Sequence, residues 1–316
     1  MTNFKHILLH KQNILCAVFF ISVCLMLVGC SPLNGKPDPE NTVTEAETSM
    51  QAWNPNESTV EIPTITEQET QSIAQPRGPV AGERTVANLL LTAKQPLGST
   101  MYIWGGGWNE ADTAAGEDAR TIGISPRWAE FAALQDAQYD YNSTKYQIRD
   151  GLDCSGYVGW LLYNVFETEN NQEGYVIPST SMAREFADRG YGTYTAAGQV
   201  NDWKAGDVMS MKGHVWIALG MCEDGSVVML HASPPGVILC GTALPHTASS
   251  EAVQLAEEYM GRHYPDWYAK YPDCSRGYFY QTDSAQMRWN SETLTDDEGL
   301  TALSAEEVLQ WLFEEL

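Results

Sequence analysis

One cysteine and two histidines in the middle of the chain are of the residue types that nucleophilic catalysis uses. Cys154 stands at the expected start of a helix, where the positive end of the helix dipole and free backbone N–H groups favour a thiolate. His214 and His231 lie in two consecutive expected strands joined by a tight turn, which brings them to the same end of a sheet. A thiol that faces an imidazole, itself oriented by a third polar group, is a nucleophile with its base. The pattern predicts Cys154 as nucleophile, His214 as base and His231 as orienting residue.

Plainer interpretations of these residues stay open. A cysteine at the start of a helix is often buried without chemistry, and a strand histidine is often a structural group. Zinc accepts thiolate and imidazole ligands, but no Cys-x-x-Cys pair occurs in the sequence, so neither a metal nor another cofactor is expected. Asp207 could orient His214 in place of His231, although it is expected to shape the turn into the strand.

The elements that must hold these residues form one predicted α+β domain over residues 81–290. Apolar residues at helical spacing predict helices over 85–94, from 153 onward and over about 181–189, the last ended by Gly190. Strands are predicted over 214–222 and 226–232, separated by a Glu-Asp-Gly turn, with further strands at 237–240 and 277–281. Helices that precede a meander of strands favour N-terminal helices packed on a central antiparallel sheet.

Five short sequence blocks together resemble those of a known family. The blocks are Tyr102-Ile103-Trp104-Gly105-Gly106, Asp153-Cys154-Ser155-Gly156, Gly206-Asp207-Val208, Gly213-His214-Val215 and Leu230-His231-Ala232, in this order. In type and order they resemble the signature blocks of the NlpC family of bacterial cell-wall cysteine peptidases. The resemblance spans roughly residues 83–235. It implies a papain-like α+β fold with the nucleophilic cysteine at a helix N-terminus.

The resemblance also implies an activity and the residues that perform it. The family hydrolyses an amide bond in peptidoglycan stem peptides, usually the bond between the γ-carboxyl of D-glutamate and a diamino acid. By motif, Cys154 is the nucleophile, His214 the base and His231 the third polar residue. Tyr102 matches a tyrosine whose hydroxyl lies beside the nucleophile and helps to hold the oxyanion, and the backbone N–H of Cys154 could contribute.

Three more residues are implied as substrate contacts. Asp153 and Ser155 match positions that contact the free amino end of the stem peptide in some members of the family. Ser181 matches a substrate-side serine in part only, because the arginine that often precedes that block is absent here and Ser179 stands nearby.

Two departures from the family pattern bear on the substrate. Trp216 follows the His214-Val215 pair where the family usually has glycine, and on a strand it shares a face with His214, so we expect it to narrow the pocket. The stretch before Cys154 is much longer than in the family, which indicates an insertion at about 108–150 with a helix over 126–138. This insertion either forms a wall of the substrate cleft or has no role at the site.

The two ends of the chain are expected to lie outside the catalytic domain. Residues 1–30 have the basic start and apolar run of an export signal, and the run ends in Leu27-Val28-Gly29-Cys30, which resembles the lipobox of bacterial lipoproteins. That resemblance implies lipidation of Cys30 and a lipid anchor on the extracytoplasmic side of the membrane; an uncleaved anchor with an incidental cysteine is the alternative. Residues 31–80, rich in Pro, Thr and Glu, are predicted to be a disordered tether. Residues 291–316 are predicted to form an acidic C-terminal helix with a capping box at Ser304 and Glu307.

The composition excludes several classes of function. The chain has 316 residues, with 41 acidic against 18 basic side chains and a net charge of -23. Such a charge argues against nucleic-acid binding and against adhesion to anionic lipid through a basic patch. Seven cysteines are too few for a disulfide scaffold at this length, and pairing among Cys222, Cys240 and Cys274 stays open. The expected partners are peptidoglycan stem peptides or muropeptides and the membrane lipid, for a chain expected to be a monomer.

Three hypotheses for the function follow. The first is a membrane-tethered cysteine peptidase that acts on peptidoglycan stem peptides. The second is an amidase or acyltransferase that uses the same three residues on another cell-envelope substrate. The third is a non-catalytic lipoprotein that binds wall fragments.

Overall fold

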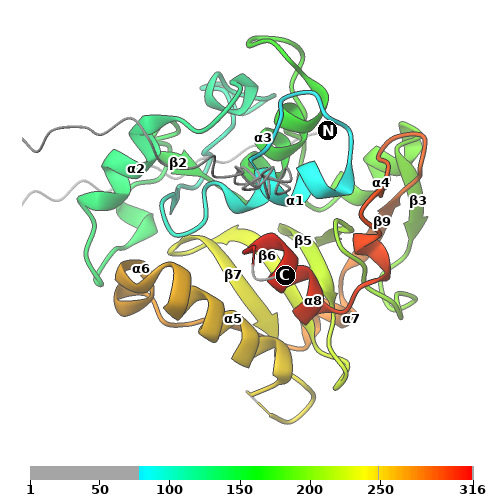
Figure 1. Cartoon of the computed structure of the whole chain (residues 1–316). Helices are drawn as coiled ribbons and strands as arrows, with labels where there is room; N and C mark the ends of the chain where they lie inside the picture. Colours follow the sequence, from blue (N-terminus) through cyan, green and yellow to red (C-terminus); the bar gives the residue numbers. More distant parts are fainter. Residues whose placement is uncertain (1–77, 248, 315–316) are drawn as a thin grey trace, which may run out of the picture. The chain divides into compact units, whose positions relative to one another are not determined.

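A sheet of nine strands runs through the part of the chain that the computed structural model describes, residues 78–247 and 249–314 (Figure 1). The strands are β1 (Met101–Tyr102), β2 (Gly151–Leu152), β3 (Gly192–Thr195), β4 (Val208–Met211), β5 (His214–Met221), β6 (Val227–Ser233), β7 (Gly236–Thr242), β8 (Ser275–Arg276) and β9 (Ala285–Trp289). Their order across the sheet is β2-β1-β7-β6-β5-β4-β9-β3, with β8 paired to β7. Only the β1–β2 and β7–β8 pairs of this sheet are parallel. The predicted α+β class with an antiparallel sheet is confirmed at this level.

Helices pack against the central strands of this sheet. Their bounds are α1 (Val86–Lys94), α2 (Pro126–Ala133), α3 (Cys154–Phe166), α4 (Met182–Asp188), α5 (Glu251–His263), α6 (Pro265–Lys270), α7 (Phe279–Thr282) and α8 (Ala305–Leu312). In the view of Figure 1, α1 and α3 lie above strands β5–β7, α5 lies below them and α6 lies to their left. The helix α3 contacts α1, β5 and β6, while α5 lies along β7 and α8 against β5.

Local hydrogen bonds explain where several helices begin and end. The Thr85 hydroxyl accepts a hydrogen bond from the Asn88 amide at the start of α1, and Ser304 and Glu307 form a capping box at the start of α8. Gly190 follows α4 with a φ of +85°, the left-handed conformation that glycine adopts most readily. The predicted helix over 85–94, the predicted glycine end of α4 and the predicted capping box are confirmed.

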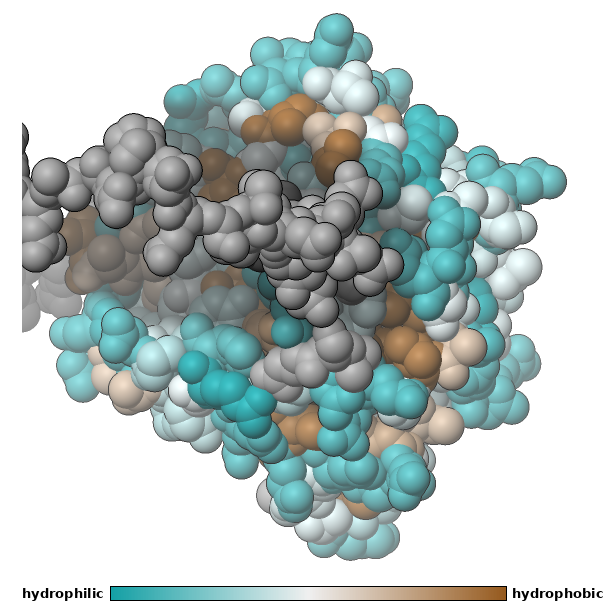
Figure 2. Space-filling model, in the orientation of Figure 1, coloured by the Kyte–Doolittle hydropathy of each residue, from teal (hydrophilic) through white to brown (hydrophobic). Residues whose placement is uncertain are grey.

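The centre of the hydrophobic core is α3. All thirteen of its residues are buried, as expected for a helix covered on every side by other elements. Trp160 of α3 packs edge-on against Trp128 of α2, with 5.7 Å between ring centroids. Because α3 is enclosed by other elements, its first turn is held in place by the core. The surface in Figure 2 is mostly hydrophilic by contrast, with smaller hydrophobic groups between the polar residues.

Some predicted elements are wrong. Residues 277–281 are not a strand, because α7 occupies Phe279–Thr282 and the strands β8 and β9 lie on either side of it. Three consecutive aromatic residues, Tyr278 to Tyr280, give this segment a high strand propensity. Helices α5 and α6 were not predicted, since the face that α5 buries includes two small alanines, Ala252 and Ala256, which give a weak hydrophobic signal.

The helix predicted over 126–138 is shorter than expected. It ends at Ala133, and the Asp136 carboxylate then accepts a hydrogen bond from the Gln138 amide at 2.9 Å. Such a local turn competes with continuation of a helix. The C-terminal helix is likewise confined to α8, within the acidic segment 291–316.

Other predictions concern the cysteines and the ends of the chain. Cys154, Cys222, Cys240 and Cys274 are all free and buried, so no disulfide joins cysteines of the described residues. Cys30, the rest of the predicted signal over 1–30 and nearly all of the predicted tether over 31–80 lie outside the described residues. Within the described part, no helix has the length and apolar character needed to cross a membrane.

Candidate functional site

The first turn of α3 is held by the residue before Cys154. Asp153 is the N-cap residue, and its Oδ1 accepts hydrogen bonds from the Gly156 amide at 2.7 Å and the Ser155 hydroxyl at 2.8 Å. Its Oδ2 accepts a hydrogen bond from the Gly105 amide at 3.2 Å. Burial nevertheless raises the pKa of Asp153 to about 6, because the loss of water outweighs these three donors. This cap ties the segment after β1 to the first residue of the helix, Cys154.

Close backbone contacts bring the segment after β1 onto the same turn. Tyr102 of β1 pairs in parallel with Leu152 of β2, two residues before Cys154. A Cβ atom at Gly156 would collide with the carbonyl oxygen of Gly106, so only glycine fits at this contact. The sequence blocks at 102–106 and 153–156 therefore meet directly in space.

A pocket of about 410 Å³ opens at Cys154. It is formed by the segment after β1, the first turn of α3, the loop before α4 and the turn before β5. The lining residues are Tyr102, Trp104, Gly105, Trp108, Asp112, Thr113, Asp153, Cys154, Ser155, Pro178, Ser179, Thr180 and Gly213. Of the residues predicted from the sequence, Cys154, Tyr102, Asp153 and Ser155 thus lie at one pocket.

The segment predicted to be an insertion, 108–150, supplies part of the pocket lining. Trp108, Asp112 and Thr113 belong to it. The indole N–H of Trp108 donates a hydrogen bond to the Ser155 hydroxyl at 3.0 Å, which links this segment to the first turn of α3. Of the two alternatives left open for the insertion, a wall beside the site agrees with these contacts.

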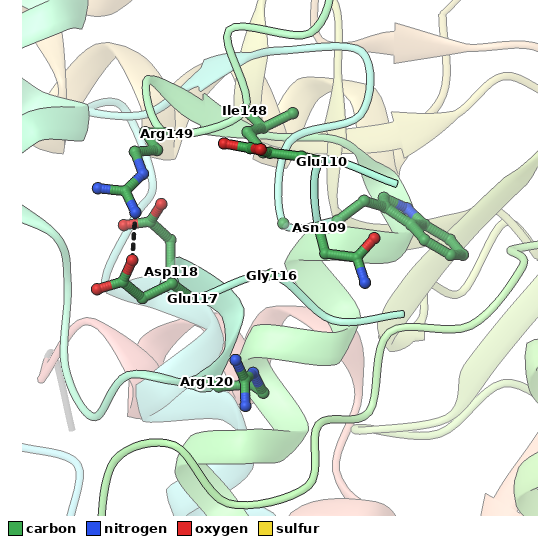
Figure 3. Close-up of a pocket in the computed structure, with 10 residues that line it drawn as sticks. Asn109, Glu110, Gly116, Glu117, Asp118, Arg120, Ile148 and Arg149 are labelled. Carbon is green, nitrogen blue, oxygen red and sulfur yellow. Dashed lines mark hydrogen bonds and ion pairs between the residues drawn. The ribbon is translucent and has the colours of Figure 1, made fainter. Parts of the chain in front are cut away.

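A second, smaller pocket of about 180 Å³ shares Trp108 with the first (Figure 3). Two of its five charged side chains form an ion pair, Arg149 with Glu117, next to Asp118. Burial raises the pKa of Asp118, and the positive charge of Arg149 acts against that rise. This pocket contains none of the residues predicted to take part in catalysis.

The two predicted histidines are hydrogen-bonded to each other. His214 Nε2 and His231 Nδ1 are 2.8 Å apart, and the ring planes are inclined at 79°. His231 is completely buried on β6, and His214 is half-buried at the start of β5. The Tyr280 ring of α7 lies edge-on to both, with centroids 5.6 Å from His214 and 6.0 Å from His231. On the far side of the pair, Arg276 Nε donates to His231 Nε2 at 3.2 Å.

Burial and a buried cation keep both imidazoles neutral. Burial lowers the pKa of His214 to about 4, and the positive charge of Arg276 acts in the same direction. Burial lowers the pKa of His231 well below its usual range, with further lowering by Arg276 and by His214. Neither ring carries a positive charge near neutral pH in this structure.

The Cys154 thiol is also in its neutral form. Burial raises the pKa of Cys154 to about 12, and the negative charge of Asp153 adds to the rise. Hydrogen bonds from the Val215 and Ser155 amides and from the Ser179 hydroxyl act in the opposite direction. The expected preference for a thiolate at the helix N-terminus is therefore not met, because desolvation exceeds the effect of the helix end. The contact with Val215 places the thiol beside the start of β5, where His214 is the preceding residue.

Two predicted substrate contacts lie away from the pocket lining. Trp216 is completely buried and donates a hydrogen bond from its indole N–H to the Ser284 hydroxyl at 3.0 Å, so it does not narrow the pocket as expected. The Tyr280 ring of α7 lies against both Trp216 and His214, so α7 covers this face of β5 and the indole is part of the core. The Ser181 hydroxyl bonds to Glu185 at the start of α4, whereas its neighbours Ser179 and Thr180 line the pocket.

Asp207 belongs to a separate cluster. Its carboxylate forms an ion pair with Arg288 of β9 at 2.7 Å and accepts hydrogen bonds from Gln286 and from the Lys204 amide. The bond to Lys204 closes the turn before β4, as predicted for this residue. The ring of His214 instead has His231 as its hydrogen-bond partner.

Three residues at the site were missed from the sequence. Arg276 lies in a strand of two residues with no periodic pattern, and Tyr280 lies in the segment wrongly predicted to be a strand. Both reach the histidine pair only through the pairing of β8 with β7 and the fold of α7. Trp108 was counted only as part of the insertion, and nothing in its local sequence points to Ser155.

One group of possible metal ligands occurs among the described residues, apart from the Cys154 pocket. The ligand atoms of Cys222, Asp224 and Glu251 lie within 4.8 Å of one another. Both carboxylates are engaged in a reciprocal cap of α5: the Asp224 carboxylate accepts from the Glu251 amide at 2.8 Å and the Glu251 carboxylate accepts from the Asp224 amide at 3.3 Å. These two hydrogen bonds cap the start of α5, and they explain why the two carboxylates lie close together.

Comparison with protein-family models, with curated proteins and with solved structures finds no match for this chain. The case for a function therefore depends on the residues and the geometry described above.

Proposed function

We propose that this protein is a cysteine peptidase with Cys154 as nucleophile, His214 as base and His231 as the residue that orients the base. The observation that carries the proposal is the convergence of three elements. Cys154 begins α3 at a pocket, its thiol contacts the Val215 amide of β5, and the preceding His214 is hydrogen-bonded to His231 of β6. A thiol at a helix start beside strand-borne imidazoles is the arrangement of papain-like enzymes, which is the finer fold assignment that we propose.

The chemistry would proceed by acyl transfer to sulfur. The proton of Cys154 passes to His214, and the thiolate attacks the amide carbonyl carbon. The oxyanion that forms would accept hydrogen bonds from the backbone N–H of Cys154 and the hydroxyl of Tyr102, which lines the same pocket. The C–N bond then breaks as His214 gives its proton to the leaving amine, and water hydrolyses the thioester.

The substrate that we propose is a peptidoglycan stem peptide, cleaved between D-glutamate and a diamino acid. This choice rests on the resemblance of the five sequence blocks to the NlpC family. Asp153 and Ser155 line the pocket and would face the amino end of the stem. The carboxylate of Asp153 is already engaged by three donors of the chain, so it would act on the substrate mainly through its charge.

We further propose that the enzyme is exported and anchored to the membrane by lipid on Cys30. The proposal rests on the export-signal pattern and the lipobox-like end of residues 1–30. Treatment of cells with labelled fatty acid, followed by capture of the protein, should label the wild type and not Cys30→Ala.

The decisive test of the activity is digestion of purified sacculi and defined muropeptides, followed by mass analysis of the products. Cys154→Ala should abolish the release of new amino groups from the muropeptides. Cys222→Ala, which removes a second buried free thiol, should still release them. Product masses identify the bond, so an amidase or an acyltransferase would be recognised by different fragments. Undiminished cleavage by Cys154→Ala would contradict the proposal.

A non-catalytic binder of wall fragments is the second candidate, and the neutral, buried state of Cys154 favours it. It predicts that muropeptides bind without any change of mass. It also predicts that an iodoacetamide reagent fails to label Cys154 selectively near neutral pH.

A further inference from the structure

A hydrogen-bonded chain of three side chains, Arg276, His231 and His214, determines where the protons of the histidine pair lie. Arg276 Nε lies 3.2 Å from His231 Nε2, and His231 Nδ1 lies 2.8 Å from His214 Nε2. The arginine side chain is only 10% exposed, and His231 is completely buried, so water does not compete for these bonds. A guanidinium can donate hydrogen bonds but cannot accept them.

The direction of each hydrogen bond follows from this asymmetry. Because Arg276 donates, His231 Nε2 must accept and therefore carries no proton. A neutral imidazole has one N–H, so the proton of His231 lies on Nδ1 and is donated to His214 Nε2. The neutral His214 must then carry its own proton on Nδ1. Both rings are thus Nδ1–H tautomers.

This tautomer has a consequence for Cys154. Since Nε2 of His214 is turned to His231, Nδ1 is the ring nitrogen left for the thiol. In the base step the S–H bond of Cys154 breaks, its electron pair stays on sulfur and its proton must form a new bond to that nitrogen. In the tautomer imposed by Arg276 the nitrogen already carries a proton and can only donate.

We propose that Arg276 is a positioning residue that sets the tautomer of the His214–His231 pair and holds the site in a form that cannot take the proton of Cys154. The inference deepens the proposed peptidase function, and the effect of Arg276 on catalysis rests on that function. When the Arg276–His231 bond opens, the proton of His231 can move to Nε2 and that of His214 to Nε2, which frees His214 Nδ1 to act as base. The number of protons is unchanged, so no other reactant is needed.

The surroundings of the pair contain no other group that would reverse this assignment in the described structure. His231 is faced by His214 of β5, by Arg276 of β8 and by the Tyr280 ring of α7. Arg276 itself is held by the Ser275 carbonyl at 2.7 Å and by the largely exposed carboxylate of Asp273 at 3.6 Å. The strand that carries it has only two residues and pairs with β7 alone. This bond can therefore open by movement of the Arg276 side chain or of a two-residue strand that no other strand pairs with besides β7.

The test is nitrogen NMR of the imidazole side chains in the full chain, without substrate. Nitrogen shifts distinguish a ring N–H from a bare ring nitrogen, and His214→Gln and His231→Gln assign the two rings among the six histidines. We expect Nδ1–H at both rings in the wild type. A wild-type His231 with its proton on Nε2 would overturn the proposal whatever the variants do.

Arg276→Met tests the cause, because it keeps an apolar stem and removes both the donor and the charge. We expect the Nε2–H form to appear at both rings and alkylation of Cys154 by iodoacetamide near neutral pH to become about tenfold faster, the change that one pKa unit corresponds to. Arg276→Lys is a variant that keeps the positive charge. Arg262→Met is the matched control, because it removes an exposed arginine on α5. Unchanged tautomers or slower alkylation in folded Arg276→Met would refute the proposal; if that variant does not fold, the wild-type spectrum decides.

These measurements separate the two proposals. Tautomers and alkylation are read without any substrate, so they can support the role of Arg276 even when no muropeptide is cleaved. Cleavage that depends on Cys154, in a protein whose His231 carries its proton on Nε2, would support the peptidase and reject the role of Arg276.

Discussion

The buried carboxylate of Asp153 predicts an unusual dependence of stability on pH. We consider the substitution Asp153→Asn, which keeps an oxygen acceptor for the Gly156 amide, puts an NH2 group in place of the oxygen that faces the Gly105 amide, and cannot ionise. Asparagine is also a favourable N-cap residue, so the first turn of α3 should persist. The substitution thus removes a titration and leaves most of the structure around Cys154 in place.

The magnitude follows from the pKa of Asp153, which burial raises from its ordinary 3.8 to about 6. A carboxyl group that binds its proton more tightly in the folded state stabilises the fold at low pH, and this contribution is lost as the pH rises through the folded pKa. Two pKa units correspond to about 3 kcal/mol. The free energy of unfolding of the wild type, relative to Asp153→Asn, should therefore fall by about 2 kcal/mol between pH 4 and pH 7, because pH 4 already lies slightly above the ordinary pKa and part of the contribution is lost there.

Urea unfolding of both proteins at half-unit steps of pH measures this difference, and other titrating groups cancel when the two curves are subtracted. Asp188→Asn, which removes an exposed carboxylate from the end of α4, is the matched control for loss of a carboxylate at the surface. A wild type that instead gains stability over Asp153→Asn as the pH rises would show that the three hydrogen bonds outweigh burial. That result would refute the reasoning for Asp153 and weaken the same reasoning for Cys154.

Three further predictions concern packing, a buried ion pair and the pocket wall. Gly156→Ala should lower the free energy of unfolding by at least about 1–3 kcal/mol, because the new Cβ collides with the Gly106 carbonyl, and urea unfolding measures the loss. Arg288→Met should cost about 3–5 kcal/mol by the same measurement, since it leaves the buried carboxylate of Asp207 without its cation. Trp108→Phe removes the indole donor to a serine hydroxyl of the α3 turn, a bond worth about 1 kcal/mol, and should weaken muropeptide binding in calorimetry by about fivefold.

Matched controls exist for these variants within the same chain. Gly261 is a helical glycine of α5 where an added Cβ meets only ordinary contacts of at least 3.5 Å, so Gly261→Ala should be tolerated. Arg262→Met removes an exposed arginine and should change the free energy of unfolding by less than about 1 kcal/mol. A loss in Gly261→Ala equal to that in the α3 variant would contradict the argument from close backbone approach. Unchanged muropeptide binding by Trp108→Phe would show that the indole N–H of Trp108 does not contribute to ligand binding.

Features decided within a few residues could be predicted from the sequence. The start of α1 at Thr85, the capping box at Ser304 and the glycine end of α4 all depend on hydrogen bonds or backbone angles of near neighbours. The hairpin of β5 and β6 likewise follows from two apolar runs and a short turn. These interactions form wherever the local sequence occurs, so a pattern of residue types is sufficient to recognise them.

The chemical state of the candidate site was decided only by the tertiary structure. The residue types and their order bring Cys154, His214 and His231 to attention, but their protonation depends on burial by elements far away in the chain. Arg276 lies forty-five residues beyond His231 and reaches it only because β8 pairs with β7. Desolvation and long-range charge act through space, and a helix N-terminus that favours a thiolate in water holds a neutral thiol once α3 is buried in the core.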